Sequence, residues 1–245
     1  MLYPIMTKAR LLIDLCGVWS FKTDNGKGFE EKWQERKLED AIPMPVPASY
    51  NDLQESEKFR EHYGWVFYQR TVALPQKSVE GQRVVLRFGA VTHYAKVYWN
   101  GKLIGEHKGG FLPFEMEIGE VLSEGENLLT VAVDNRIDYT TLPVGGKSDM
   151  LGGMFPTGGE EKTKRNHPNF DFFNYCGITR PVRIYTTPKE YIQDITVVPK
   201  VQGAAAELFY EVQTGGSGTV RLEMYDREGK KAAEAEGATG VLKLS

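Results

Sequence analysis

The side chains with the greatest capacity for metal binding or nucleophilic chemistry are four histidines and two cysteines: His62, His93, His107, His167, Cys16 and Cys176. No histidine has a second one three to five residues away, so the spacing gives weak support to a zinc site. We therefore expect surface or hydrogen-bonded structural histidines. Two cysteines cannot form a disulfide framework or a thiolate metal site by themselves, and free thiols in a reducing cytoplasm are the simpler interpretation. We expect no metal and no cofactor.

Motifs for other common reactions are absent from the sequence. It contains no phosphate-binding loop, no dinucleotide-binding glycine triplet and no Gly-x-Ser-x-Gly nucleophile turn. Glycoside hydrolysis needs two carboxyl groups facing each other across the scissile bond. The chain has 33 acidic residues, but sequence alone cannot pair any two of them, and most must be solvated. We therefore assign no catalytic residue.

Charge and hydropathy exclude further classes of partner. The formal net charge is -3 with no basic stripe, so we expect no nucleic-acid partner. The densest cationic patch, Lys162, Lys164 and Arg165, is interpreted as a solvated loop. No window approaches the ~18 apolar residues of a membrane-spanning helix. The apolar run at 11–13 is too short for a secretory signal, which needs at least ~7 residues, and we expect a cytoplasmic location without membrane contact.

The elements that must position these side chains have mostly a period of two. Strands are expected over residues 64–70, 84–88, 95–99, 102–105, 129–134 and 182–185. Asn100-Gly101 predicts a type I′ hairpin turn, since both residues tolerate positive φ. The alternation at 129–134 predicts one buried and one exposed face. Polar residues at 30–37 and 119–123 each predict one short helical turn.

This pattern makes residues 14–187 an all-β region, typical of an antiparallel sandwich or jelly roll. Between 135 and 169 the strand pattern stops and glycine, threonine, proline and lysine dominate. Loops of this length are generally functional or disordered, and we favour a functional loop over a passive insertion.

Pro188 marks the start of a second β region. Strands are expected at 192–198, 207–212 and 219–225, with a hairpin tip at 215–218 between the last two and a further turn at 226–229. An immunoglobulin-type sandwich needs about 100 residues and seven strands. We therefore expect an incomplete sandwich with an open edge.

Several segments, in order along the chain, resemble the β-glucuronidase branch of the family-2 glycoside hydrolases. The narrowest match is Asp-Phe-Phe-Asn-Tyr-Cys-Gly-Ile-Thr-Arg-Pro-Val at 171–182, and the longest is the block at 100–114, which contains Gly-Gly-Phe-Leu-Pro-Phe. Shorter blocks lie at 15–21, 45–52 and 64–68.

The resemblance implies an architecture and an activity. Residues 1–187 are expected to form a jelly-roll, galactose-binding-like domain, and 188–245 part of an immunoglobulin-like domain. In such enzymes a TIM barrel follows with two catalytic glutamates, and we expect this chain to end before it and to be inactive alone. The implied substrate is a β-D-glucuronide, hydrolysed with retention by a homotetrameric full-length enzyme.

The resemblance also implies one substrate contact. In the family, the aspartate at this position of the block reaches the active site and accepts a hydrogen bond from a sugar hydroxyl, and Asp171 matches it. An ionised carboxylate suits this role, because it accepts strong hydrogen bonds. The alternative is that Asp171 only caps a turn.

The remaining residues of the block are interpreted as structural. We expect four of them to pack: Phe172, Phe173, Tyr175 and Cys176. Asn174 is expected to hydrogen-bond locally or to shape the site, and Gly177 to adopt an unusual backbone angle. Arg180 is expected to pair with an acid across a domain interface. We favour a core position over a sugar-stacking platform for Trp19, Trp65 and Trp99. The loop at 150–165 is interpreted as an insertion.

Two alternatives to a part of a hydrolase stay open. A jelly roll is also a common lectin architecture, which would fit a stand-alone carbohydrate-binding module. An exposed half-sandwich would instead fit an assembly module.

Overall fold

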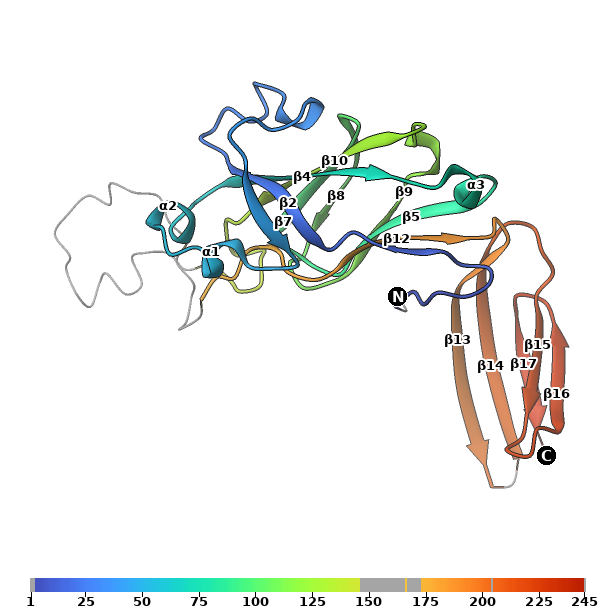
Figure 1. Ribbon diagram of the computed structural model, residues 1–245. Coiled ribbons are helices and arrows are strands. Elements are labelled where there is room, and N and C mark those ends of the chain that lie inside the picture. The colour runs from blue at the N-terminus through green and yellow to red at the C-terminus, as the bar shows by residue number, and fades with distance from the viewer. Residues whose placement is uncertain (1–2, 146–165, 167–172, 204, 245) are drawn as a thin grey trace, which may run out of the picture. The chain divides into compact units, whose positions relative to one another are not determined.

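The computed structural model describes residues 3–145, 166, 173–203 and 205–244. The chain divides into two compact units. The first comprises residues 11–80 and 84–186, and the second comprises 1–10, 81–83 and 187–245. Figure 1 shows the strands of both units coloured along the chain.

The first unit contains a six-stranded antiparallel sheet. Its order is β3 (Ile42–Val46), β2 (Gly17–Thr23), β4 (Trp65–Ala73), β10 (Glu126–Asp134), β7 (Tyr94–Trp99) and β8 (Lys102–Lys108). The central strands are rich in β-branched and aromatic residues, which suit a pleated and buried surface. All of the strands predicted in this region are present.

Two smaller sheets complete the first unit. One has the order β1 (Leu12–Asp14), β12 (Val182–Thr187), β5 (Arg83–Phe88) and β9 (Phe114–Glu117), and the other pairs β11 (Gly177–Ile178) with β6 (Val91–Thr92). A single hydrophobic core draws side chains from all three sheets, among them Trp19, Tyr68, Phe88, Ile178 and Ile184. This arrangement confirms the predicted all-β jelly-roll sandwich.

Helices in this unit are single turns. The predicted polar segments contain the 3-10 turns Trp33–Glu35 and Gly119–Val121. Three four-residue helices were not predicted: α1 (Tyr50–Leu53), α2 (Glu57–Arg60) and α3 (Gln76–Val79). One turn is too short to produce a helical hydrophobic period, which explains why they escaped prediction.

The hairpin turn at Asn100-Gly101 joins β7 to β8, as predicted. Asn100 has φ 50° and Gly101 has φ 80°, the two positive angles that a type I′ turn requires. The side chain of Asn100 also accepts a hydrogen bond from the Leu128 amide at 2.8 Å, which ties the turn to β10.

The prediction of one exposed face on β10 is wrong, because every residue from Leu129 to Asp134 is buried. Alternate residues face the sandwich core, while Ala132 packs on the other face with Trp33, Phe67 and Tyr98. The segment around Trp33 covers this outer face of the sheet.

Gln69 holds that covering segment in place. It is buried on β4, and its amide nitrogen donates to the carbonyls of Trp33 and Arg36, both at 2.8 Å. Its oxygen accepts from the Leu38 amide at 2.8 Å. A buried amide without such partners would cost stability, so the sheet and its cover stabilise each other.

The second unit, taken by itself, contains five antiparallel strands among its described residues. One sheet has the order β13 (Tyr191–Gln202), β14 (Ala205–Gly215) and β17 (Thr239–Leu244), and the other pairs β15 (Arg221–Tyr225) with β16 (Lys231–Glu236). Tyr210, Val212 and Leu242 form its small core.

The predicted hairpin tip at 215–218 is wrong. Both edges of β14 are occupied, by β13 and β17, so residues 215–218 lead from one sheet to the other. The turn at 226–229 is confirmed, since it joins β15 to β16 and the Asp226 carboxylate accepts from the amides of Glu228 and Lys230.

Candidate functional site

Asn135 organises the loops at one end of the first unit. It directly follows β10 and is 1% exposed. Its side-chain nitrogen donates to the Tyr50 hydroxyl at 2.8 Å and to the His62 carbonyl at 2.6 Å, and its side-chain oxygen accepts from the Gly64 amide at 2.9 Å. These bonds satisfy the buried amide and fix the backbone where the sheet ends.

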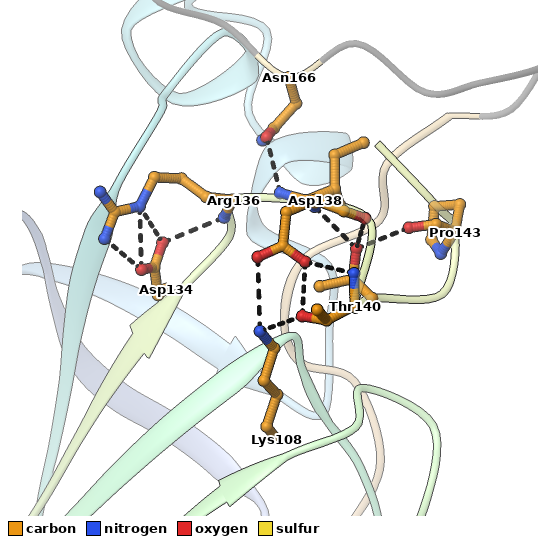
Figure 2. A network of polar contacts seen from close by, with 9 residues as sticks. Lys108, Asp134, Arg136, Asp138, Thr140, Pro143 and Asn166 are labelled. Carbon is orange, nitrogen blue, oxygen red and sulfur yellow. Dashed lines mark hydrogen bonds and ion pairs between the residues drawn. The ribbon is translucent and has the colours of Figure 1, made fainter. Parts of the chain in front are cut away.

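The main-chain carbonyl of Asn135 accepts two further side-chain amides. Asn166 Nδ2 donates to it at 2.9 Å, and Asn174 Nδ2 donates at 3.1 Å. A carbonyl oxygen has two lone pairs and can accept both bonds. Asn166 also accepts from the Ile137 amide at 3.0 Å (Figure 2). Asn135, Asn166, Asn174 and His93 are called the Asn135 cluster below.

Asn174 joins several elements to this cluster. Its Oδ1 lies 2.6 Å from Nε2 of His93, which is buried and directly precedes β7. Since Asn174 Nδ2 donates to Asn135, its Oδ1 is the acceptor and His93 carries its proton on Nε2. The main-chain carbonyl of Asn174 accepts from Asn51 Nδ2 of α1 at 2.8 Å.

The residues after Asn174 are anchored as firmly. The Cys176 amide donates to Ser49 Oγ at 3.1 Å and to Asn51 Oδ1 at 3.2 Å. The Cys176 side chain is fully buried in the core, and burial raises the pKa of its thiol. A thiol kept protonated in this way is not a nucleophile, so Cys176 contributes packing.

A charged network fixes the loop that follows β10 (Figure 2). The Arg136 guanidinium pairs with the Asp134 carboxylate, which raises the pKa of Arg136. Asp138 accepts from the hydroxyl and amide of Thr140, both at 2.6 Å, and these bonds hold the pKa of Asp138 below its usual value. Lys108 Nζ, at the end of β8, lies 3.4 Å from Asp138 Oδ2.

Burial lowers the pKa of both His93 and His62 below the usual histidine value. His93 Nδ1 is buried and has no hydrogen-bond partner among the described residues. A second proton on this ring would therefore have no acceptor. We expect neutral imidazoles at pH 7, with structural roles as predicted for the histidines.

Acidification from pH 7.5 to 5 is expected to lower the free energy of unfolding. A histidine with a depressed folded pKa contributes full stability above its unfolded pKa of about 6.5, and this contribution is lost as pH falls through the folded pKa. Urea unfolding at several pH values measures how steeply the free energy of unfolding changes with pH, which is the slope referred to below. His93→Gln keeps a donor toward Asn174 but cannot titrate, so it should flatten the slope, and an unchanged slope would contradict the assignment.

The structure places some predicted site residues and leaves others outside the described residues. Asp171 and Phe172 lie outside them, as do the cationic patch and the loop at 150–165. Gly177 has the predicted unusual backbone angle, φ 110°. Arg180 donates to the Phe111 carbonyl at 3.4 Å, and its pairing across a domain interface stays a prediction.

Two of the three tryptophans named above lie in the core as expected, whereas Tyr175, which was expected to pack, is 44% exposed. Trp19 and Trp99 are 1% and 0% exposed in the core, so neither can stack on a sugar. Trp65 is half-buried and packs beside Phe29 at 5.1 Å between ring centroids. Phe173 contacts Tyr175 at 4.8 Å.

Sequence reasoning missed Asn135, Asn166 and Asn51 as organising residues. An asparagine directly after a strand is an ordinary turn signal, and nothing in its spacing reports that it will be buried. Within the part of the chain that the structure describes, no three acidic, histidine or cysteine side chains gather to hold a metal. None of the helices described is long and apolar enough to cross a membrane.

The first unit is a jelly-roll sandwich with one end built from hydrogen-bonded asparagine-rich loops. Residues 12–188 match the family model described as "Glycosyl hydrolases family 2, sugar binding domain". The chain belongs to family 2 of the glycosyl hydrolases.

Curated relatives are similar over the entire chain. A β-glucuronidase of Paenibacillus borealis is 41% identical over 100% of this chain, and that of Sus scrofa is 38% identical over 100%. The chain spans 41% and 39% of the length of these two relatives.

Solved structures show the same correspondence. A β-glucuronidase of an uncultured Clostridium species superposes with a TM-score of 0.84 at 44% identity, covering 100% of this chain and 41% of that one. The Bifidobacterium dentium β-glucuronidase complexed with coumarin-3-O-glucuronide gives a TM-score of 0.84 at 41% identity, covering 100% and 43%.

Proposed function

We propose that this chain is the N-terminal, non-catalytic part of a β-glucuronidase, a retaining hydrolase of β-D-glucuronides. The observation that carries the proposal is the match of the whole chain to proteins named β-glucuronidase at 38–41% identity. Solved relatives include complexes with coumarin-3-O-glucuronide and with D-glucuronic acid. The chain would brace a catalytic domain and supply one substrate contact.

That contact is Asp171. Its carboxylate would accept a hydrogen bond from a sugar hydroxyl, and a charged acceptor makes such a bond strong. Support comes from the resemblance of the block at 171–182 to the β-glucuronidase signature, in which the aspartate at this position contacts the sugar. We assign no catalytic acid, base or nucleophile to this chain.

Several further properties belong to the same proposal. The domain boundary lies between residues 187 and 188, and the second unit is immunoglobulin-like. The enzyme is a homotetramer in the cytoplasm. Cys16 and Cys176 are both free, and thiols persist in a reducing compartment. Burial raises the pKa of Cys16 to about 11, which keeps this thiol protonated.

Release of p-nitrophenol from its β-D-glucuronide tests the proposal. The 245-residue chain and the protein made from the complete coding sequence are assayed side by side. Hydrolysis by the complete protein and none by the chain is expected. Hydrolysis of the galactoside or glucoside in place of the glucuronide would contradict the substrate class, and activity of the chain alone would contradict its non-catalytic role.

A further inference from the structure

The sheet formed by β13, β14 and β17 in the second unit has an exposed face with an apolar row across its middle. On β14, Tyr210 and Val212 point into the small core, so the residues that alternate with them point to the opposite face, called the outer face below. The register aligns Val198, Phe209 and Val241 on the outer face, and they are 55%, 43% and 43% exposed. Three adjoining apolar side chains form a patch, unlike the scattered single ones of an ordinary soluble surface.

Charged rows of opposite sign flank this apolar row. On one side lies a row with two lysines and one glutamate, and so a net charge of +1: Lys200, Glu207 and Lys243. On the other side lies a row with one glutamate and a net charge of -1: Thr196, Glu211 and Thr239. The charged groups are open to solvent, and even the pair formed by Lys243 and Glu207 is loose, with 4.0 Å between Nζ and Oε1.

The outer face is therefore complementary to itself. A two-fold axis along the apolar row brings this row against the same row of a second copy. Each lysine-containing row then faces the row of the other copy that contains Glu211. A two-fold axis along the strands would instead bring rows of like charge together. Charge thus favours the first arrangement, in which one patch meets its own copy, as in two-fold symmetric dimers.

We propose that the outer face of β13, β14 and β17 is an interaction surface for a second copy of this chain, with Phe209 of the two copies in contact at its centre. The inference deepens the proposed homotetramer, on which it rests in the complete enzyme, by naming one surface between copies. Its test uses no glucuronide, so the inference can fail while the proposed activity stands, and the reverse also holds.

The size of the outer face predicts how strong this contact is. Three strands about 4.8 Å apart, rising about 3.4 Å per residue, give a face of roughly 14 by 25 Å, or about 350 Å² per copy. Stable interfaces bury about 1,200–2,000 Å² in total, so about 700 Å² is a weak contact when it acts alone. We expect association of the 245-residue chain only at high concentration, and firm association where other contacts between copies act with it.

Charge reversal tests the proposed arrangement by sedimentation velocity of the 245-residue chain at increasing concentration. Glu211→Lys should raise the dissociation constant of the dimer about 10-fold or more, because it sets like charges against each other. The double variant with Lys200→Glu and Lys243→Glu should do the same, because it sets acidic side chains against Glu211. An equimolar mixture of the two variants should restore the dimer, since each row then faces one of opposite sign.

Glu228→Lys is the matched control for these variants. Glu228 is exposed on the turn between β15 and β16, outside the outer face, so reversing its charge should leave the dissociation constant unchanged. A chain that stays monomeric at every concentration overturns the proposal. So does a mixture that fails to restore the dimer, or a dimer that all of the reversals leave intact. Copies would then meet elsewhere, as on the exposed apolar side chains of Ile192, Ile195 and Val201.

Cross-linking asks whether the same contact forms in the protein made from the complete coding sequence. Phe209→Cys with a short bismaleimide should give covalent dimers beyond any formed by the unsubstituted protein, because the proposed axis passes between the two copies of this residue. Glu228→Cys should react with a single maleimide but give no added dimer. If another segment of the same chain covers the outer face, Phe209→Cys will resist both reagents, and the second copy is the wrong occupant.

Discussion

Gly177→Ala is expected to lower the unfolding free energy of the first unit by about 3 kcal/mol or more, the largest stability effect predicted here. Gly177 has φ 110°, which L side chains rarely adopt. A Cβ at this position would collide with the Tyr68 hydroxyl and lie 3.1 Å from Tyr50 Cδ1. Both tyrosines are 0% exposed, so neither ring can move aside.

The backbone and steric contributions can be separated with Gly64→Ala. Gly64 has φ 134°, but a Cβ there meets nothing within 4 Å. This control should cost only the backbone strain, about 1–3 kcal/mol. Thermal unfolding followed by circular dichroism compares the two, with a drop of about 10 °C expected for Gly177→Ala. Equal drops would show that the tyrosines relax and the packing argument is wrong.

Asp171→Ala in the protein made from the complete coding sequence is expected to reduce kcat/KM for p-nitrophenyl β-D-glucuronide about 10- to 100-fold. Hydrogen bonds to a charged group contribute roughly 1.5–3 kcal/mol, which corresponds to this range. Asp171→Asn keeps an acceptor without the charge and should give an intermediate loss. Steady-state kinetics on the glucuronide measures all three proteins.

The matched control is Asp226→Ala in the second unit, where the carboxylate accepts from two backbone amides of a turn. It removes an aspartate that caps a turn and should leave kcat/KM unchanged. If Asp171→Ala matched this control, Asp171 would be a turn cap and the substrate contact would be lost from the proposal. A decrease in kcat alone would indicate that the hydrogen bond from the sugar to Asp171 forms only in the transition state. An increase in KM alone would indicate that the bond is equally strong in the bound substrate and in the transition state.

Local sequence patterns predicted β4, β5, β7, β8, β10 and β12 of the first unit, whereas β1, β2, β3, β6, β9 and β11 were not predicted. The hairpin at Asn100-Gly101 was predictable because its chemistry is complete within two residues, both of which tolerate positive φ. The turn at 226–229 was predictable for the same reason, since Asp226 bonds to the amides two and four residues ahead. The position of Gly177 was also anticipated as a special backbone angle.

Two errors came from contacts that are distant in the sequence. The exposed face expected on β10 is covered by the segment around Trp33, about a hundred residues earlier in the chain. The hairpin expected at 215–218 fails because β14 pairs with β17 instead of β15. The alternation of apolar residues and the glycine content predict the local geometry of a strand or turn. They do not predict which strand or segment will pack against it.

The sequence alone determined the all-β class, the hairpin at Asn100-Gly101 and the resemblance that singled out Asp171, because each depends on residues close together in the chain. The tertiary structure alone decided that Asn135, Asn166 and Asn174 share one carbonyl oxygen and that His93 binds Asn174. The physical reason is that a buried polar group must find its partners wherever the fold brings them, and the partners Asn51 and Asn174 lie 123 positions apart. Such partners become apparent only when the strands have placed the loops at a common end of the sheet.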